Sequence, residues 1–284
     1  AYNRIALLDE ESKKRGLIAS SAGNHAQGVA YAAQKLGVKA TIVMPKATPL
    51  IKVEATRKYG AEVVLAGEVY DEAYKEAKRL QEENGYEFIH PFNDDDVIVG
   101  QGTISLEILE EVPDADILMV AIGGGGLAAG IAHCAKLLNP NIKIIGVEPE
   151  GAQCMKAAFE NGSPVELCKV STIADGAAVK LAGERTYELL KDVIDEIVTV
   201  SDYELMDAFL VLLEKHKLIA ENAGILSLAG LKKIKEKNKK VVSVISGGNI
   251  DVLTISSMIT KGLVSRGRIF SFSVDLTDKP GELV

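Results

Sequence analysis

The sequence predicts an α/β fold with mainly parallel sheets, and three observations support this. Short apolar runs alternate along the chain with longer segments in which apolar residues recur at helical spacing. The apolar runs are nearly unbroken, as in "ILMVAI" at 117–122, which is typical of parallel strands covered on both faces. Glycines such as Gly37 and Gly60 stand where helical segments should end. Strands and helices in alternation form βαβ units, so the sheets should be parallel.

The elements follow one another from the start of the chain, where residues 1–16 read as helical. The predicted strands are residues 16–19, 40–44, 62–65, 87–89, 117–122, 142–148, 196–200 and 241–245. The predicted helices are residues 24–36, 50–58, 70–84, 97–111, 127–138, 202–215 and 223–237. Asp202 and Glu204 lie near the positive end of one of these helices, which supports its predicted start.

The last part of the chain has a different pattern. Phe270, Phe272, Val274 and Leu276 alternate with polar residues, as in a half-buried strand. A single strand cannot bury its own apolar face. Residues 269–284 are therefore predicted to start a further domain, joined by a linker at 261–268 to a main domain at 1–260, and we expect both ends of the chain to continue.

Composition excludes several classes of protein. The chain has 284 residues and is 47% hydrophobic, and its net charge of −8 comes without a basic block, which argues against a nucleic-acid partner. It contains neither an apolar run long enough to span a membrane nor a secretory or transit signal. Cys134, Cys154 and Cys168 are odd in number and lack CxxC spacing, so we expect a cytoplasmic protein without disulfides or structural zinc.

The glycine-rich stretch "IGGGGLAAG" at 122–130 carries the strongest local signal. Glycines between a strand and a helix allow close approach to a ligand, and the free N–H groups of the helix start attract an anion such as phosphate. The simpler alternative is a tight turn. Gly124, Gly126 and Ala129 also satisfy a dinucleotide-binding pattern, and Glu148 ends the next strand, so a nicotinamide-dependent dehydrogenase stays an open alternative.

Two further loops have the same strand-to-helix character. In "SSAGNH" at 20–25, Ser21, Asn24 and the backbone around Gly23 and His25 could bind a carboxylate, although serine and asparagine are also common helix caps and a lone histidine is usually a packed residue. In "SGGN" at 246–249, Ser246 offers a hydroxyl at the carboxyl end of a strand, where open α/β sheets bind ligands.

Five motifs in this order, "SAGNHAQG", "GGGGL", "TIADG", "ENAG" and "SGGN", resemble those of pyridoxal-phosphate enzymes of fold type II, and most closely those of threonine and serine dehydratases. The resemblance implies two parallel-rich α/β subdomains flanking a cofactor cleft, the smaller one at roughly 20–100. The tail "RIFSFSVDLTDKPGEL" is similar to the start of an ACT regulatory domain. Such enzymes serve amino-acid metabolism, including isoleucine biosynthesis, and the ACT-like tail implies allosteric control by an amino acid.

The resemblance also implies roles for individual residues. Gly123, Gly124, Gly125, Gly126 and Leu127 would hold the cofactor phosphate, Asn24 the ring hydroxyl and Ser246 the pyridine nitrogen. Ser21, Ala22, Gly23 and His25 would form the loop that receives the substrate carboxylate. The lysine that carries the cofactor would lie just upstream of Ala1, because Lys13, Lys14, Lys46 and Lys52 stand in a different sequence context.

The reaction implied is the dehydration and deamination of L-threonine to 2-oxobutanoate and ammonia, or of L-serine to pyruvate. Related racemases carry a serine at the position of Ala22, and alanine has no proton to give, so racemisation should be poor. A racemase, a β-replacing enzyme of the same fold and a non-catalytic amino-acid sensor remain alternatives. The family also implies a homodimer or homotetramer and a cation, for which Asp175 is a candidate ligand.

Overall fold

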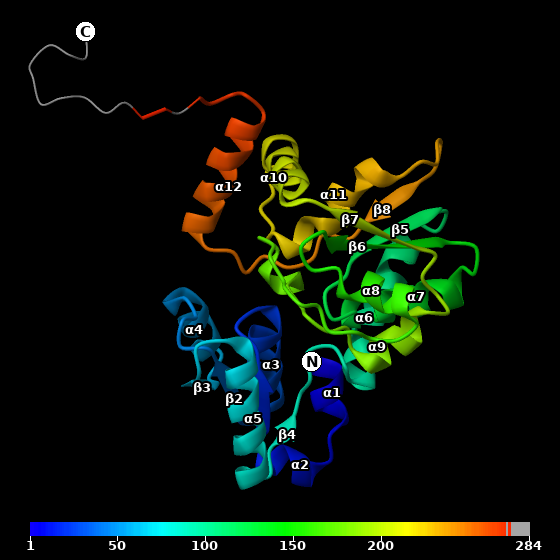
Figure 1. Cartoon of the computed structure of the whole chain (residues 1–284). Helices are drawn as coiled ribbons and strands as arrows, with labels where there is room; N and C mark the ends of the chain where they lie inside the picture. Colours follow the sequence, from blue (N-terminus) through cyan, green and yellow to red (C-terminus); the bar gives the residue numbers. More distant parts are fainter. Residues whose placement is uncertain (271, 274–284) are drawn as a thin grey trace, which may run out of the picture.

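The computed structural model describes residues 1–270, 272 and 273, and the predicted ACT-like strand lies mostly outside them. The described chain forms two parallel sheets of four strands each (Figure 1). The first sheet has the order β3-β2-β1-β4. Its strands are β1 (Leu17–Ser20), β2 (Ala40–Met44), β3 (Glu62–Leu65) and β4 (Glu87–Phe88). They fall within or close to the range 20–100 predicted for the smaller subdomain.

The second sheet has the order β7-β6-β5-β8, and all its pairings are parallel. Its strands are β5 (Ile117–Ala121), β6 (Lys143–Pro149), β7 (Glu196–Val200) and β8 (Val241–Ser243). Every residue of β5 is buried, because helices cover both faces of this central strand. The predicted α/β class with parallel sheets is confirmed.

Two apolar clusters show how the second sheet is covered. Leu118 and Val120 of β5 face one cluster, and the intervening Met119 faces the other, as the twofold period of a strand requires. The first cluster contains residues of α6 (Asp95–Glu111), α7 (Gly126–Leu138), α8 (Cys154–Asn161) and α9 (Glu184–Leu190). The second contains residues of α10 (Asp202–Val211), α11 (Leu226–Gly230) and α12 (Val252–Ser265).

The first sheet is covered in the same way with smaller side chains. Ala26, Val29 and Ala33 of α3 (Asn24–Leu36) pack on one face together with Val53 of α4 (Leu50–Arg57). Ala73 and Ala77 of α5 (Tyr70–Asn84) pack on the other face. Within the described residues, no helix has the length and apolar character needed to cross a bilayer.

Three sequence predictions about helices are wrong in part. The predicted opening helix is two helices, α1 (Tyr2–Leu7) and α2 (Glu10–Arg15), because the Asp9 carboxylate accepts from the Ser12 N–H and starts a new helix. The helix predicted at 223–237 stops at Lys233, and it is a short α11 flanked by 3₁₀ turns. Residues 235–240 are exposed and lysine-rich, so no apolar face continues the helix.

The predicted linker at 261–268 is also partly helical. Helix α12 runs through Ser265, so the first five residues of that linker are helical. Its buried residues Met258 and Gly262 pack toward α10, where a Cβ on Gly262 would lie 2.8 Å from Leu210. Helices α8, α9 and α12 were absent from the sequence prediction, and all three contribute to the two apolar clusters.

Candidate active site

Loops from both sheets meet through one buried carboxylate. Glu221, only 7% exposed, accepts a hydrogen bond from the Asn24 side chain at 2.6 Å and another from the Asn249 backbone N–H at 3.0 Å. Burial raises the pKa of Glu221, and the bond from Asn24 opposes this shift. The structure thereby joins three predicted segments, "SAGNH", "ENAG" and "SGGN". Glu221 itself was missed as a site residue, although its motif was recognised.

The loop between β5 and α7 presents unpaired backbone donors. Within the described residues, the N–H groups of residues 123–127 have no hydrogen-bond partner, although Gly124, Gly125 and Gly126 are buried. Gly125 has φ +93°, a left-handed conformation that favours glycine. A buried N–H without a partner costs free energy, so this loop at the start of α7 is built to accept an anion.

The four glycines of this loop are also required by close packing. A Cβ on Gly124 would lie 2.4 Å from the Phe92 ring, and one on Gly125 would lie 2.6 Å from Met155. Phe92 follows β4, and His90 fixes that turn by accepting from the backbone N–H groups of Phe92 and Asn93. Burial lowers the pKa of His90 to about 4, so the ring is neutral and its Nδ1 can accept. Sequence reasoning missed Phe92, for which no motif was available.

The model of the pyridoxal-phosphate dependent enzyme family matches residues 1–247. The chain belongs to this family. It is 51% identical to an L-threonine ammonia-lyase of Thermotoga maritima over 284 residues, which are 100% of this chain and 71% of that protein. Its fold resembles a threonine deaminase isoform 2 from Solanum lycopersicum, with a TM-score of 0.88, 41% identity and coverage of 91% of this chain and 77% of that one.

The maize serine racemase is a further structural relative, with a TM-score of 0.85, 36% identity and coverage of 94% of this chain and 83% of that one. Together these findings confirm the predicted family, fold class, enzyme class and cofactor. The residues fit pyridoxal phosphate, because free buried N–H groups at the start of α7 match the needs of a phosphate.

The loop after β1 differs from the loop between β5 and α7 (residues 123–127, the phosphate-type loop) because its contacts are made by side chains. The Ser21 hydroxyl accepts from the Gly23 N–H at 3.2 Å, and Ala22 is half-buried beside it. Nothing lies within 4 Å of a Cβ placed on Gly23. The His25 ring donates from Nε2 to the Ile89 carbonyl at 2.8 Å, and burial lowers its pKa to about 4. His25 is therefore neutral, and its ring is already engaged.

Ser246 lies beyond the end of β8 and is half-buried. Its N–H donates to the Gly224 carbonyl at 3.0 Å, and a Cβ on Gly224 would lie 1.6 Å from the Ser246 carbonyl oxygen. Glycine at position 224 is therefore what allows "ENAG" and "SGGN" to lie against each other. This close approach fixes the backbone that carries the Ser246 hydroxyl.

Glu148 does not have the role that the dehydrogenase alternative requires. It is fully buried, and its two carboxylate oxygens accept from the backbone N–H groups of Met155 and Lys156, both at 2.8 Å. Both oxygens are thus used to hold the start of α8. The Glu148 carboxylate is therefore not available to bind a ribose hydroxyl. Without this acid, the pattern of Gly124, Gly126 and Ala129 does not indicate a dinucleotide site.

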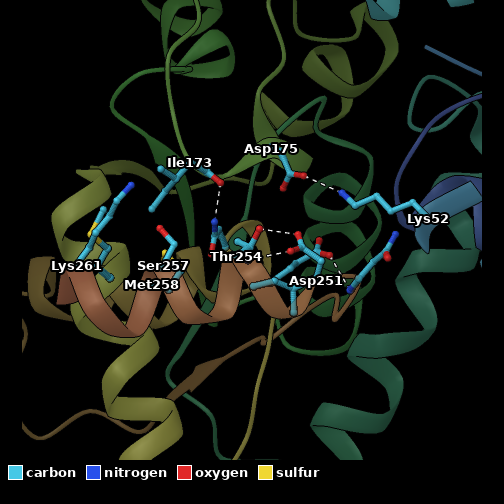
Figure 2. Close-up of a pocket in the computed structure, with 13 residues that line it drawn as sticks. Lys52, Ile173, Asp175, Asp251, Thr254, Ser257, Met258 and Lys261 are labelled. Carbon is cyan, nitrogen blue, oxygen red and sulfur yellow. Dashed lines mark hydrogen bonds and ion pairs between the residues drawn. The ribbon is translucent and has the colours of Figure 1, made fainter. Parts of the chain in front are cut away.

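A cavity of about 310 Å³ lies beside Glu221, between α12 and the segment that contains Ile173 and Asp175 (Figure 2). Lys52 of α4 reaches across it to Asp175 at 3.1 Å, and the Asn222 amide donates to the Ile173 carbonyl at 2.8 Å. Asp175 is thus ion-paired rather than grouped with other cation ligands. Among the described residues, no group of three or more His, Cys, Asp or Glu side chains could hold a metal ion.

Proposed function

We propose that this chain is the catalytic part of a threonine ammonia-lyase, which converts L-threonine to 2-oxobutanoate and ammonia and L-serine to pyruvate. The observation that carries the proposal is the row of unpartnered N–H groups at 123–127, of which those of Gly124, Gly125 and Gly126 belong to buried residues. The second support is that Glu221 joins the "SAGNH" and "SGGN" segments. The identity of 51% to an L-threonine ammonia-lyase supports the choice of reaction. Threonine and serine differ by one methyl group, so both are proposed as substrates.

The cofactor would be held at three places. The N–H groups of Gly123 through Leu127 would bind its phosphate, and the Ser246 hydroxyl would face its pyridine nitrogen. Asn24 would donate to its ring hydroxyl through the amide hydrogen that Glu221 does not use, since the Nδ2 group has two hydrogens and Glu221 accepts only one. Glu221 therefore orients Asn24 for this contact.

The remaining residues would orient the substrate. The Ser21 hydroxyl, which the Gly23 N–H orients, and the backbone N–H of His25 would receive the substrate carboxylate. The open space beside Gly23 leaves room for it. When bound, pyridoxal phosphate supplies a sink for the electrons left behind by the α-proton of the substrate. Ser246 is uncharged and would not form an ion pair with the ring nitrogen, so the bound cofactor would be a weaker electron sink, which favours loss of the β-hydroxyl. The enamine that is released hydrolyses to the oxo acid and ammonia.

Ala22 favours elimination over racemisation. Alanine offers no proton on the face of the substrate where the related racemases carry a serine. We expect Ala22→Ser to raise the rate of D-serine formation from L-serine at least several-fold, measured by chiral chromatography. Ala22→Gly is the matched control, because it changes size without adding a hydroxyl, and a racemisation rate that rises equally in both variants would contradict this role for Ala22.

We further propose that the lysine that carries the cofactor lies on a segment before Ala1, and that the whole protein is a homodimer or homotetramer whose ACT-like part binds an amino-acid effector. The relatives are longer than this chain, which spans 71% of the Thermotoga maritima protein. The three cysteines are free, which supports a reducing, cytoplasmic setting.

The decisive experiment uses the full-length protein. An absorption band in the violet that borohydride shifts, together with release of 2-oxo acid from L-threonine or L-serine, is expected. A colourless protein that ignores added pyridoxal phosphate would overturn the proposal. Binding of an amino acid without any release of ammonia would instead favour the sensor alternative.

A further inference from the structure

The back of the phosphate-type loop, on the side away from its free N–H groups, is held by two buried side chains. The Thr186 hydroxyl of α9 is fully buried and donates to the Gly124 carbonyl at 2.6 Å. The Cys154 thiol of α8 donates to the Gly123 carbonyl at 3.5 Å. Thr186 also lies 3.0 Å from the Gly183 carbonyl, but its single hydrogen favours the nearer acceptor.

These two bonds set the direction of the loop's donors. In a trans peptide the C=O of one residue and the N–H of the next point in opposite directions. Holding the Gly123 and Gly124 carbonyls toward α8 and α9 therefore turns the N–H groups of Gly124 and Gly125 the other way. A glycine backbone has wide conformational freedom, so without such support these N–H groups would sample many directions.

Glu148 supports the same loop through α8. Its carboxylate binds the N–H groups of Met155 and Lys156 at the first turn of α8, the turn that also carries Cys154. Met155 lies so close to the loop that a Cβ on Gly125 would be 2.6 Å from its methyl group. A shift of this turn would therefore move both the Cys154 thiol, which donates to the Gly123 carbonyl, and the Met155 side chain, which packs against Gly125.

We propose that Thr186 and Glu148 are positioning residues that aim the N–H groups of the 123–127 loop at the cofactor phosphate. The inference rests on the proposed function, because it assumes that this loop binds that phosphate. Neither residue touches the reacting atoms. Their effect should therefore appear in cofactor affinity and only for ligands that carry the phosphate.

The test compares pyridoxal phosphate with pyridoxal, which lacks the phosphate, as ligands of the full-length protein. Thr186→Val removes the hydroxyl but keeps the shape, and we expect it to raise the Kd for pyridoxal phosphate about tenfold, the equivalent of about 1.4 kcal/mol. Its Kd for pyridoxal should change less than threefold. Thr186→Ser keeps the hydroxyl, so this control variant should bind both ligands as the unmodified protein does. The ³¹P NMR shift of the bound phosphate should change in Thr186→Val but not in Thr186→Ser.

Glu148→Gln provides an independent test that keeps the side-chain shape. The amide can accept at only one end, so one N–H of α8 loses its acceptor, and we expect a selective loss of pyridoxal phosphate affinity of several-fold or more. Burial raises the pKa of Glu148 to about 7, and Cys154 and Lys156 of α8 are the titratable groups that act on it. The affinity ratio between the unmodified protein and Glu148→Gln should fall toward one from pH 8 to pH 6, because the neutral acid resembles the amide. Titration of the phosphate itself is common to both proteins and cancels in this ratio.

Three results would overturn the inference: equal binding by Thr186→Val and Thr186→Ser, equal losses for pyridoxal phosphate and pyridoxal, or a pH-independent ratio for Glu148→Gln. If the unmodified full-length protein failed to bind pyridoxal phosphate at all, the proposed function would fall instead. The two failures are therefore distinguishable. Should Thr186→Val fail to fold in a urea titration, Thr186→Ser and Glu148→Gln still decide the question.

Discussion

The two junctions between strand and helix that flank the site are built in different ways. At the β1–α3 junction, the polar contacts come from side chains such as Ser21, Asn24 and His25, and a Cβ on Gly23 would meet nothing within 4 Å. At the β5–α7 junction, the polar groups on offer are backbone N–H groups without a partner. A Cβ on any residue from 123 to 126 would lie 3.0 Å or less from a neighbouring atom.

The difference separates two tasks. A loop closely packed from behind holds its N–H groups in place before the ligand arrives, so little binding energy is spent on ordering it. A loop with open space beside it leaves room for a substrate that comes and goes. The packed junction thus suits a resident cofactor, and the open junction suits a substrate that is replaced at every turnover.

The largest expected effect is a pH dependence that separates the two junctions. His25, at the open junction, has a pKa of about 4 in the folded protein, below its ordinary value. Below pH 6.5 the unfolded chain binds the proton more readily, so stability should fall as the pH drops from 6.5 to 4, by on the order of 3 kcal/mol. Glu148, behind the packed junction, has a folded pKa of about 7, so its contribution runs the other way and is lost as the pH rises from 4.5 to 7.

His25→Gln separates these contributions, because a glutamine Nε2 can still donate to the Ile89 carbonyl but does not titrate. Urea unfolding of the full-length protein at pH values from 4.5 to 8 should show a shallower acid loss of stability in His25→Gln. His90 has a similarly lowered pKa, so part of the dependence of unfolding free energy on pH should remain in this variant. An acid loss identical to that of the unmodified protein would show that His25 is not held neutral by burial.

The second prediction tests the packing difference directly with a matched pair of substitutions. Gly124→Ala places a methyl group 2.4–2.5 Å from three atoms of the Phe92 ring, and we expect it to cost about 1–3 kcal/mol of unfolding free energy. Gly23→Ala meets open space at negative φ and should stay within about 0.5 kcal/mol. Its methyl group occupies room proposed for the substrate, so it should raise KM for L-threonine. Denaturant unfolding measures the change in unfolding free energy, and steady-state kinetics measure KM. Equal destabilisation by the two substitutions would show that the two junctions do not differ in packing.

Sequence reasoning reached the elements but not the contacts between them. The bounds of α3 and β2 were predicted correctly, because a glycine stop and an unbroken apolar run are local signals. The bond between Asn24 and Glu221 joins residues 197 positions apart, and no periodicity reports such a contact. Thr186 was missed for the same reason, since α9 was not predicted and its contact with the Gly124 carbonyl spans 62 positions.

The same limit applies to the glycines of the packed junction. Their place between a strand and a helix was taken as a sign of phosphate binding, and the structure shows that close neighbours alone would demand glycine at each position. What points to an anion is the set of unpartnered N–H groups, and these become visible only when every acceptor around the loop is known. Glu148 was considered as a ribose ligand because its position in the sequence fits, yet its partners lie on a helix that was not predicted.

The smallest expected effect concerns the ion pair that bridges the cavity beside the open junction. Lys52 of α4 meets Asp175 at 3.1 Å, but the Asp175 side chain is 68% exposed, so solvent screens the pair and we expect a coupling energy of about 0.5 kcal/mol or less. A double-mutant cycle with Lys52→Met and Asp175→Asn, measured by urea unfolding with and without 0.5 M salt (roughly a threefold shorter screening length than in dilute buffer), isolates this term. A small coupling that salt abolishes would mean that the two sheets are joined near the site mainly through Glu221, which is only 7% exposed. A coupling energy well above 1 kcal/mol that salt leaves unchanged would instead mean that the Lys52–Asp175 pair holds the region beside the β1–α3 junction rigid. The two junctions would then differ less in rigidity than their packing suggests.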